Sequence, residues 1–443
     1  MTYRDVASKQ VLTWSLTAVG ARLPVALAPL AVVFLVRERP GGYTLGAVLA
    51  AVYVIGEIVG APLLGMRMRP ERVRPQLAAG LVAGAAGFAG LGALPHAHPL
   101  VLGAFAFLAG AAPAAAPGAM RALLTGLVPE RSVTQALSFE SVLNSGIWAL
   151  SPAVVTGLAL GVAPRVPLLL AAALMAASVG GLWALPVGRP ADETDRGGAS
   201  MARIMARAWP VYVTGAASLS LLALAELVLP ALLEQRGTGV GWAGPLLAGF
   251  SLGSVVGAFV YGLRTWPGRL HTRGLVLMTG VSACVALVAL IPDTAWMAGA
   301  LVAAGVLQAC VMLTRNLSLR EALPASALAA GYSVMYAAVG AGYAVTGSFA
   351  GAMLQVVAPS TAVLAGVGLT MTLALIGAWG ERRRTSRRWA PGERVQDEQP
   401  LTGERVPDEK PSTGEASGAR AAVEERSAGV PRPAVEQGSA VDG

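Results

Sequence analysis

Long runs of apolar residues, separated by short polar segments, organise this chain. Each run has about 17–25 residues, the helix length that crosses the hydrocarbon core of a bilayer. Backbone groups in lipid must be satisfied internally, so each run is predicted to form a membrane-spanning α-helix. The runs cover Val11–Val36, Thr44–Leu64, Leu77–Leu94, Leu100–Leu124, Ala136–Leu160, Pro167–Leu185, Val211–Leu232, Ala243–Leu263, Gly274–Ile291, Trp296–Leu313, Gly331–Val356 and Thr361–Trp379.

The end of the second run recurs at the end of the eighth. At an offset of 197, Gly56, Gly60, Ala61, Gly65 and Arg67 return as Gly253, Gly257, Ala258, Gly262 and Arg264. Glycines four apart lie on one helix face and allow a neighbouring helix to approach closely. A repeat of this size indicates a duplicated bundle. We therefore predict an all-α membrane protein of twelve helices in two pseudo-symmetric, six-helix halves.

The polar segments divide the chain into four parts. We expect an N-terminal half at residues 1–186, a cytoplasmic linker at 187–209, a C-terminal half at 210–380 and a disordered cytoplasmic tail at 381–443. In the linker, Met201, Ile204, Met205 and Ala208 share one helical face. That spacing predicts either a short helix in the membrane interface or an extension of the seventh span. The tail is rich in Gly and Pro, which is typical of low-complexity sequence.

Composition and charge agree with a membrane protein. The apolar fraction is 55% and the charged fraction 13%, too apolar for a soluble domain with an ordinary surface. The formal charge of +8 comes from arginines that cluster in alternate loops, which follows the positive-inside rule and argues against a nucleic-acid partner. The opposite loops hold only Arg37, Arg39, Arg165 and Arg236. Both termini are therefore predicted to be cytoplasmic, in a multi-pass protein of the cell membrane.

Two six-helix halves, a cytoplasmic linker and an arginine-rich loop after a glycine-rich helix resemble the major facilitator superfamily of transporters. In that family the loop after the second span reads Gly-x-x-x-Asp-Arg-x-Gly-Arg-Arg. Gly65 and Arg74 are in register with this pattern, while Arg69 replaces its acidic residue and Arg72 its second glycine. Spans 4–5 also match spans 10–11, where Arg121, Pro129 and Ser138 correspond to Arg315, Pro324 and Ser333. The resemblance implies transport by alternating access.

The direction of transport is less well defined. Drug-exporting relatives usually carry an arginine in span 4, which Ala106–Gly110 lacks, and a Gly-Pro pair in span 5. Here Ser151-Pro152 lies near Gly146 and Gly157. This partial match favours export of drug-like or amphipathic compounds in exchange for protons. The alternatives are an uptake symporter of the same fold and a non-transporting sensor or scaffold.

Charged residues within the spans indicate function, since a charge at the bilayer centre costs at least about 2.5–3.5 kcal/mol. Arg22, Glu57 and Glu226 are in this position. We expect Arg22 and Glu226 to form a pair that binds substrate or carries a proton, with a structural ion pair as the alternative. Glu57 is expected to bind a proton or to contact a neighbouring helix. Asn144, Gln308 and Tyr336 offer hydrogen bonds along the same pathway, although any buried polar group needs a partner.

A second group of charges lies near the cytoplasmic helix ends. We predict that Arg121 with Glu140, and Arg315 with Glu321, are latches that close this side, with static salt bridges as the alternative. Arg67, Arg74 and Arg264 belong to the same cytoplasmic gate.

Other patterns in the sequence argue against catalysis. Gly249–Gly253 fits the serine-nucleophile pattern Gly-x-Ser-x-Gly, but no histidine is expected within reach of Ser251. His96 and His98 have no further metal ligand beside them, and the chain has no phosphate-binding Gly-Lys-Ser/Thr loop. We expect no enzyme activity, no cofactor and no metal. The expected partners are a small-molecule substrate, protons and the lipid bilayer, and the expected state is a monomer.

Overall fold

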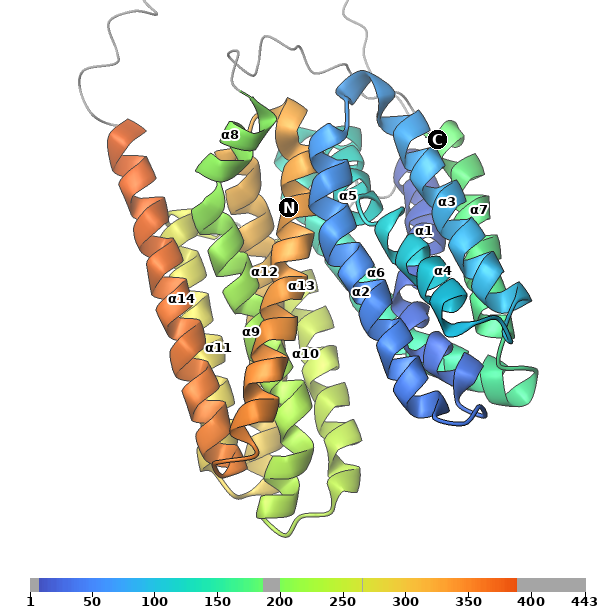
Figure 1. Cartoon of the computed structure of the whole chain (residues 1–443). Helices are drawn as coiled ribbons and strands as arrows, with labels where there is room; N and C mark the ends of the chain where they lie inside the picture. The colour runs from blue at the N-terminus through green and yellow to red at the C-terminus, as the bar shows by residue number, and fades with distance from the viewer. Residues whose placement is uncertain (1–7, 186–199, 265, 389–443) are drawn as a thin grey trace, which may run out of the picture. The chain divides into compact units, whose positions relative to one another are not determined.

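The computed structural model describes residues 8–185, 200–264 and 266–388. Within these ranges the chain is helical and contains no strand (Figure 1). The helices are α1 (Lys9–Val36), α2 (Gly42–Arg67), α3 (Val73–Ala93), α4 (Pro99–Ala111), α5 (Ala116–Leu127), α6 (Val133–Gly161), α7 (Val166–Ala184), α8 (Met201–Arg207), α9 (Trp209–Gln235), α10 (Ala243–Leu263), α11 (Leu270–Leu290), α12 (Thr294–Ala322), α13 (Leu328–Met353) and α14 (Pro359–Arg388). Short 3-10 turns at Pro70–Arg72, Glu130–Ser132, Val240–Trp242 and Ala325–Ala327 lead into α3, α6, α10 and α13.

The helices supply the twelve membrane spans that the apolar runs predicted. By length and hydropathy, the described residues contain 12 helical segments able to cross a membrane, so that prediction is confirmed. Helix α8 is too short to span, and α4 and α5 together make one span, Pro99–Leu127.

This fourth span is broken, although the sequence predicted one helix over Leu100–Leu124. Helix α4 ends at Ala111, the chain turns, and α5 begins at Ala116. Pro113 lies in the turn, and a proline there lacks the N–H that would continue the helical hydrogen bonds. Helix α5 therefore has an N-terminus of its own within the span, at Ala116.

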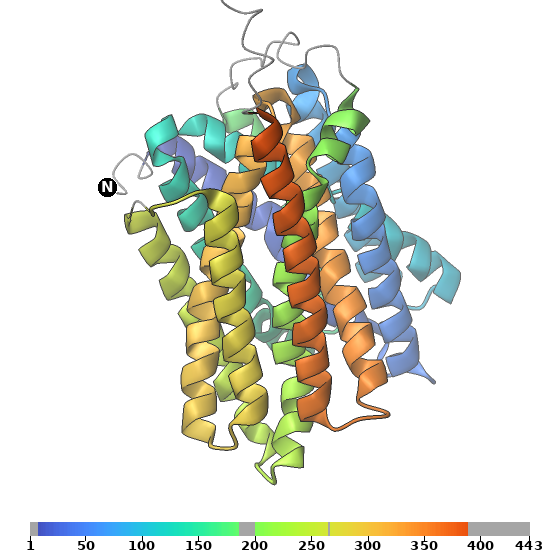
Figure 2. The same cartoon turned by 90° about the vertical axis from the view of Figure 1, so that its left-hand side faces the viewer.

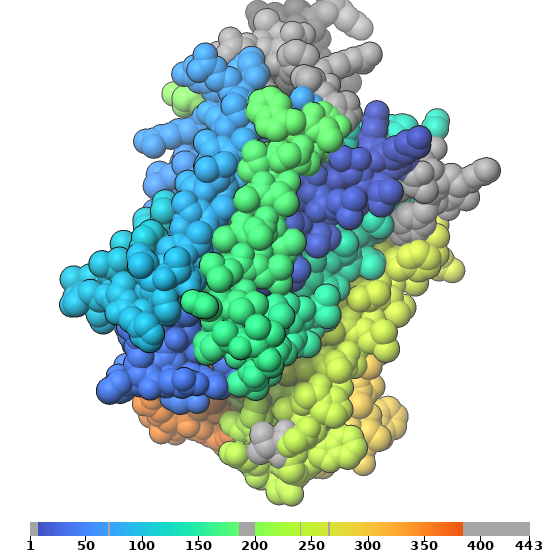
Figure 3. Space-filling model, turned by 90° about the vertical axis from the view of Figure 1, so that its right-hand side faces the viewer, coloured from blue at the N-terminus to red at the C-terminus, as the bar shows by residue number. Residues whose placement is uncertain are grey.

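The helices pack in the same way in the two halves of the chain. Helix α7 contacts α1 and α3, and α14 contacts the corresponding helices α9 and α11. Figure 3 shows α7 on the surface between α3 and α1, and Figure 2 shows α14 beside α11. Helices α2 and α4 form a close pair, as do α10 and α12.

The repeated glycines explain these close pairs. A Cβ on Gly60 would lie less than 3.0 Å from the backbone of Ala111 in α4. A Cβ on Gly257 would be equally close to the backbone of Val306 in α12. The two contacted residues are themselves 195 positions apart, so the duplication includes the helix contact as well as the glycines. Close packing at this motif, predicted from the sequence, is confirmed.

The arginine-rich loops lie together at one end of the bundle, here called the arginine-rich end. Ion pairs and hydrogen bonds join its segments: Arg320 pairs with Glu130, and Arg74 donates to the carbonyl of Leu185. At the opposite end, Arg39 donates to the carbonyls of Pro95 and Ala97.

The linker and tail differ in part from the predictions. Of the two alternatives for the linker, the structure contains the short helix: α8 is separate from α9. Its Ile204 and Met205 are buried in an apolar cluster with residues of α9 and α13, so this face packs on protein. Helix α14 continues to Arg388, beyond the predicted boundary at residue 380. The tail beyond residue 388 and linker residues 186–199 lie outside the described residues.

Candidate functional site

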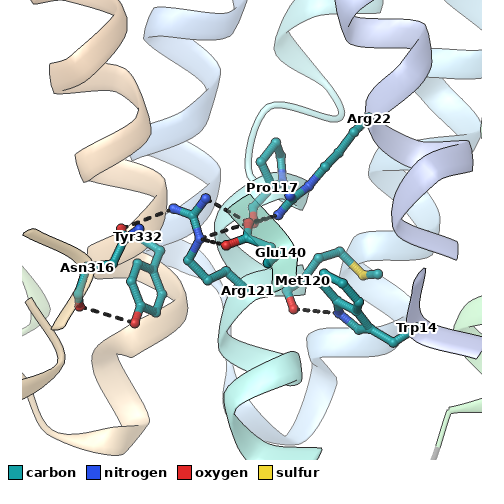
Figure 4. Close-up of polar contacts among 8 residues, drawn as sticks. All are labelled: Trp14, Arg22, Pro117, Met120, Arg121, Glu140, Asn316 and Tyr332. Carbon is teal, nitrogen blue, oxygen red and sulfur yellow. Dashed lines mark hydrogen bonds and ion pairs between the residues drawn. The ribbon is translucent and has the colours of Figure 1, made fainter. Parts of the chain in front are cut away.

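Three charged side chains meet in the interior of the first half (Figure 4). Arg22 extends from α1, Arg121 from α5 and Glu140 from α6; we call these residues the charge cluster. Arg22 Nη2 and Arg121 Nη2 each lie 2.7 Å from Glu140 Oε1. Arg121 Nε also donates to Glu140 Oε2 at 2.8 Å. Glu140 is 1% exposed and Arg22 is 5% exposed, so this carboxylate is held between two guanidinium groups away from solvent.

The broken fourth span positions the cluster. Arg22 Nη2 donates to the carbonyl of Pro117, in the first turn of α5, at 3.1 Å. Trp14, two turns earlier on α1, donates from its indole Nε1 to the carbonyl of Met120 at 2.8 Å. Its ring centroid lies 5.8 Å from the Arg22 guanidinium carbon, within range of a cation–π interaction. Helix α1 thus holds the start of α5 at two carbonyls, which fixes Arg22 and Arg121 around one carboxylate.

The cluster also contacts the second half of the chain. Arg121 Nη1 donates to Asn316 Oδ1 of α12 at 3.3 Å, and the Arg121 guanidinium lies 5.5 Å from the ring centroid of Tyr332 of α13 (Figure 4). The backbones approach closely at the same level, because a Cβ on Gly118 would lie 2.5 Å from the amide nitrogen of Ser333. The two halves therefore meet beside the charge cluster.

A second carboxyl group lies at this junction. Glu57 on α2 is half-buried and accepts a hydrogen bond from the Tyr336 hydroxyl of α13 at 3.4 Å. Tyr53, one turn earlier on α2, is fully buried beside it. Tyr336 also interacts electrostatically with Arg22 and Arg121, so the same side chain is close to Glu57 and to the charge cluster. Proton binding and a contact with a neighbouring helix were the two alternatives for Glu57, and its position at an interhelical contact is compatible with each.

The expected pairing of Arg22 with Glu226 is not what the structure contains. The acidic partner of Arg22 is Glu140, whereas Glu226 of α9 accepts a hydrogen bond from the Tyr343 hydroxyl of α13 at 3.0 Å. The sequence places both residues within their spans, but a position along a helix does not specify which helix it faces. Glu140, which the sequence assigned to a cytoplasmic latch, reaches Arg22 because α1 packs along α6.

The two predicted latches have different outcomes. Arg121 does pair with Glu140, but both belong to the first half, so this bond alone does not join the halves. Arg315 pairs with Glu381 of α14, with 2.5 Å between Nη1 and Oε1, and not with Glu321, which is exposed. Glu381 had been assigned to the tail, so the sequence offered no reason to consider it.

One ion pair that connects the halves was not predicted. Arg320, near the end of α12, pairs with Glu130 in the turn before α6. Both residues line a cavity of about 440 Å³ at the arginine-rich end, together with Thr134 and Glu321. In the sequence, Glu130 is recognisable only as a charged residue in a turn before a span.

The remaining candidate residues are dispersed. Gln308 Nε2 donates to the carbonyl of Ser218 at 2.9 Å, which joins α12 to α9. Asn144 is half-buried on α6, above Glu140 along the helix. Arg67 and Arg264 are exposed at the arginine-rich end.

The fold and the site together define a class of protein. A duplicated bundle with buried ionisable groups at the junction of its halves is the architecture of a secondary transporter. A family model for the Major Facilitator Superfamily matches residues 15–316, and the chain belongs to that family. It is therefore a transporter and not an enzyme. A search of curated protein sequences finds no match.

Solved structures of low sequence identity share the fold. The human organic anion transporter MFSD10 (TETRAN) is 13% identical, with a TM-score of 0.66 over 84% of this chain and 98% of that one. The E. coli fucose:proton symporter FucP is 14% identical, with a TM-score of 0.66 over 85% and 99%. A bacterial homologue of the iron transporter ferroportin, in an outward-facing state, is 13% identical, with a TM-score of 0.64 over 85% and 98%.

Proposed function

We propose that this chain is a proton-coupled transporter of small molecules that works by alternating access in the cell membrane. The observation that supports the proposal best is the hydrogen bond between Glu57 and Tyr336, which joins the two halves beside the charge cluster. A carboxyl group at such a contact changes its surroundings when the halves separate. Its proton affinity then depends on conformation, which is the requirement for coupling.

The moving parts in this proposal are the two halves, residues 1–186 and 210–380, in a monomer with both termini in the cytoplasm. The contacts that support it connect α2 and α5 to α13, and α6 to α10. Several of them, including Gly65 against Ser333 and Glu130 against Arg320, lie toward the arginine-rich end. In our proposal this is the conformation closed on the cytoplasmic side, and breaking these contacts opens it.

The sequence favoured export of amphipathic or drug-like compounds in exchange for protons, on the partial match in span 5. The second candidate is symport, in which proton and substrate move together. It is favoured by the charge cluster, because two guanidinium groups repel the cationic compounds that many exporters carry and attract anions. In either case Arg22, Glu57, Glu226 and Tyr336 are the residues proposed to bind substrate or protons.

Proton flux measured in reconstituted vesicles tests the proposal. Wild-type protein is placed in liposomes that contain a pH-sensitive dye, and cationic, neutral and anionic solutes are added in turn. We expect at least one solute to move protons, inward with the solute for symport and outward against it for exchange. The Glu57→Gln variant should retain solute exchange and lose the proton flux. If no solute moves protons through the wild-type protein, the proposed function is wrong.

A further inference from the structure

The charges at the junction of the halves sum to zero only when Glu57 is ionised. Arg22 and Arg121 contribute two positive charges, and Glu140 contributes one negative charge. Glu57 brings the second negative charge when it has lost its proton. Protonation of Glu57 therefore leaves one uncompensated positive charge in a region shielded from water, and a buried charge of this kind is strongly disfavoured without a partner.

The structure indicates where that positive charge is available to a ligand. Arg121 directs its Nε and both terminal nitrogens at Glu140 and Asn316. Arg22 uses only Nη2, toward Glu140 and Pro117. Its Nε and Nη1 are buried and have no hydrogen-bond partner among the described residues. A guanidinium group has a planar arrangement of donors that fits a carboxylate, so these unused N–H groups are suited to an anionic oxygen.

We propose that Arg22 binds the negatively charged group of a small organic monoanion, and that a proton on Glu57 accompanies the anion through the transport cycle. The proposal rests on the transport function argued above and specifies its substrate class as a monocarboxylate. The proton comes from the solution on the open side, is held on a Glu57 oxygen, and leaves to the other side with the anion. Both the empty, deprotonated cluster and the loaded, protonated cluster are neutral.

Neutrality in both states gives the coupling a physical reason. Closing the protein around a net buried charge costs free energy. The neutral forms are therefore the ones that change conformation easily. The anion alone, on a cluster with ionised Glu57, would leave one negative charge in excess. The proton alone would leave one positive charge. Proton and anion are therefore expected to cross together.

The surroundings of Glu57 identify it as the proton site of this arrangement. Helix α13 presents Tyr336 to it and α2 itself provides Tyr53, while the adjacent α4 carries no titratable side chain. Helix α1 provides Arg22 and α5 provides Arg121, and both interact electrostatically with Tyr336. No basic side chain of the described residues forms a salt bridge with Glu57 within 4.0 Å, so no fixed ion pair holds its charge.

Binding to the full-length protein in detergent tests the inference first. The probes are acetate, lactate and benzoate, each compared with its own amide, and the readout is thermal stabilisation. We expect at least one carboxylate to stabilise the wild-type protein while its amide does not. Its dissociation constant should rise by up to tenfold for each pH unit over the range in which Glu57 loses its proton.

Variants connect the binding to the named residues. Arg22→Gln should weaken binding about tenfold or more, because a charge-assisted hydrogen bond is lost, and Arg22→Lys should weaken it less. Arg22→Gln leaves Glu140 paired with Arg121, so the variant is expected to fold. Arg37→Gln, at the end of the same helix, is the matched control and should bind like the wild type. Glu57→Gln should bind the anion with no dependence on pH.

Flux in vesicles completes the test. The carboxylate should accumulate when only a pH gradient drives it, at a rate that an imposed membrane potential does not change. The inference is overturned if no carboxylate outperforms its amide, if Arg22→Gln binds normally, or if the pH dependence disappears in Glu226→Gln instead of Glu57→Gln. Proton flux with cationic or neutral solutes alone would also overturn it, while leaving the proposed function intact. Carboxylate binding without any solute-driven proton flux would refute the proposed function and, with it, the proton step of this inference, and would leave only the anion site at Arg22.

Discussion

Replacement of Glu140 by glutamine is the most direct test of how the charge cluster contributes to the fold. The substitution preserves the size of the side chain and removes the negative charge held between Arg22 and Arg121. Arg121 makes three contacts to this carboxylate at 2.7–3.0 Å, and Arg22 makes one at 2.7 Å. Glutamine retains one carbonyl oxygen as an acceptor, but its amide group presents donors to the guanidinium donors.

The expected loss of stability follows from the burial of the ion pair. Removing one partner of a buried ion pair costs about 3–5 kcal/mol, because the other partner remains buried without compensation. Here two guanidinium groups lose their counter-charge, so we expect a loss near the upper end of that range. For a chain of 443 residues the melting temperature should fall by about 4–6 °C.

Thermal unfolding of the purified protein, with size-exclusion chromatography as the readout, measures the change in melting temperature. The matched control is Glu226→Gln, whose carboxylate accepts a hydrogen bond from Tyr343 and is not paired with a cation in the described structure. We expect that control to lose about 1 kcal/mol or less. The double variant Glu140→Gln/Arg121→Gln should recover part of the loss, because it removes one of the two positive charges that lack a counter-charge. A melting temperature for Glu140→Gln within about 2 °C of the wild type would refute the reasoning.

Three further predictions follow from other parts of the structure. Gly257→Val should destabilise the protein by about 1–3 kcal/mol or more, because the added side chain meets the backbone of α12. Gly244→Val is the control and should express normally, because nothing lies within 4 Å of a Cβ at that position. Reversing the charge of Glu130 or of Arg320 should open the arginine-rich end and so increase cytoplasmic labelling of introduced cysteines. Reversing both charges should restore protection from labelling. Unchanged labelling in the single variants would show that this pair does not hold the halves together. A reporter fused after Gly42 should report the outside, and a cytoplasmic signal there would contradict the topology.

The sequence by itself determined the architecture of this protein. Apolar runs of bilayer length must satisfy their backbone hydrogen bonds internally in lipid, so all twelve runs are helical, the fourth as the two helices α4 and α5. The repeated glycines also determined a tertiary contact, because their spacing creates a face without side chains and the backbone of the partner helix fills it. These features are local or periodic, and a pattern along the chain is enough to reveal them.

Tertiary structure alone decided which charges meet. Arg22 and Glu226 both lie within their spans, but a position along a helix axis does not determine the rotation of the helix or the choice of its neighbour. Helix α1 packs along α6, which places Glu140 within reach of Arg22, and the added length of α14 brings Glu381 to Arg315. Arg121 and Arg315 occupy equivalent positions in the repeat, yet their acidic partners come from α6 and α14. A buried charge selects its partner by the geometry of the folded bundle, and the repeat in the sequence does not contain that geometry.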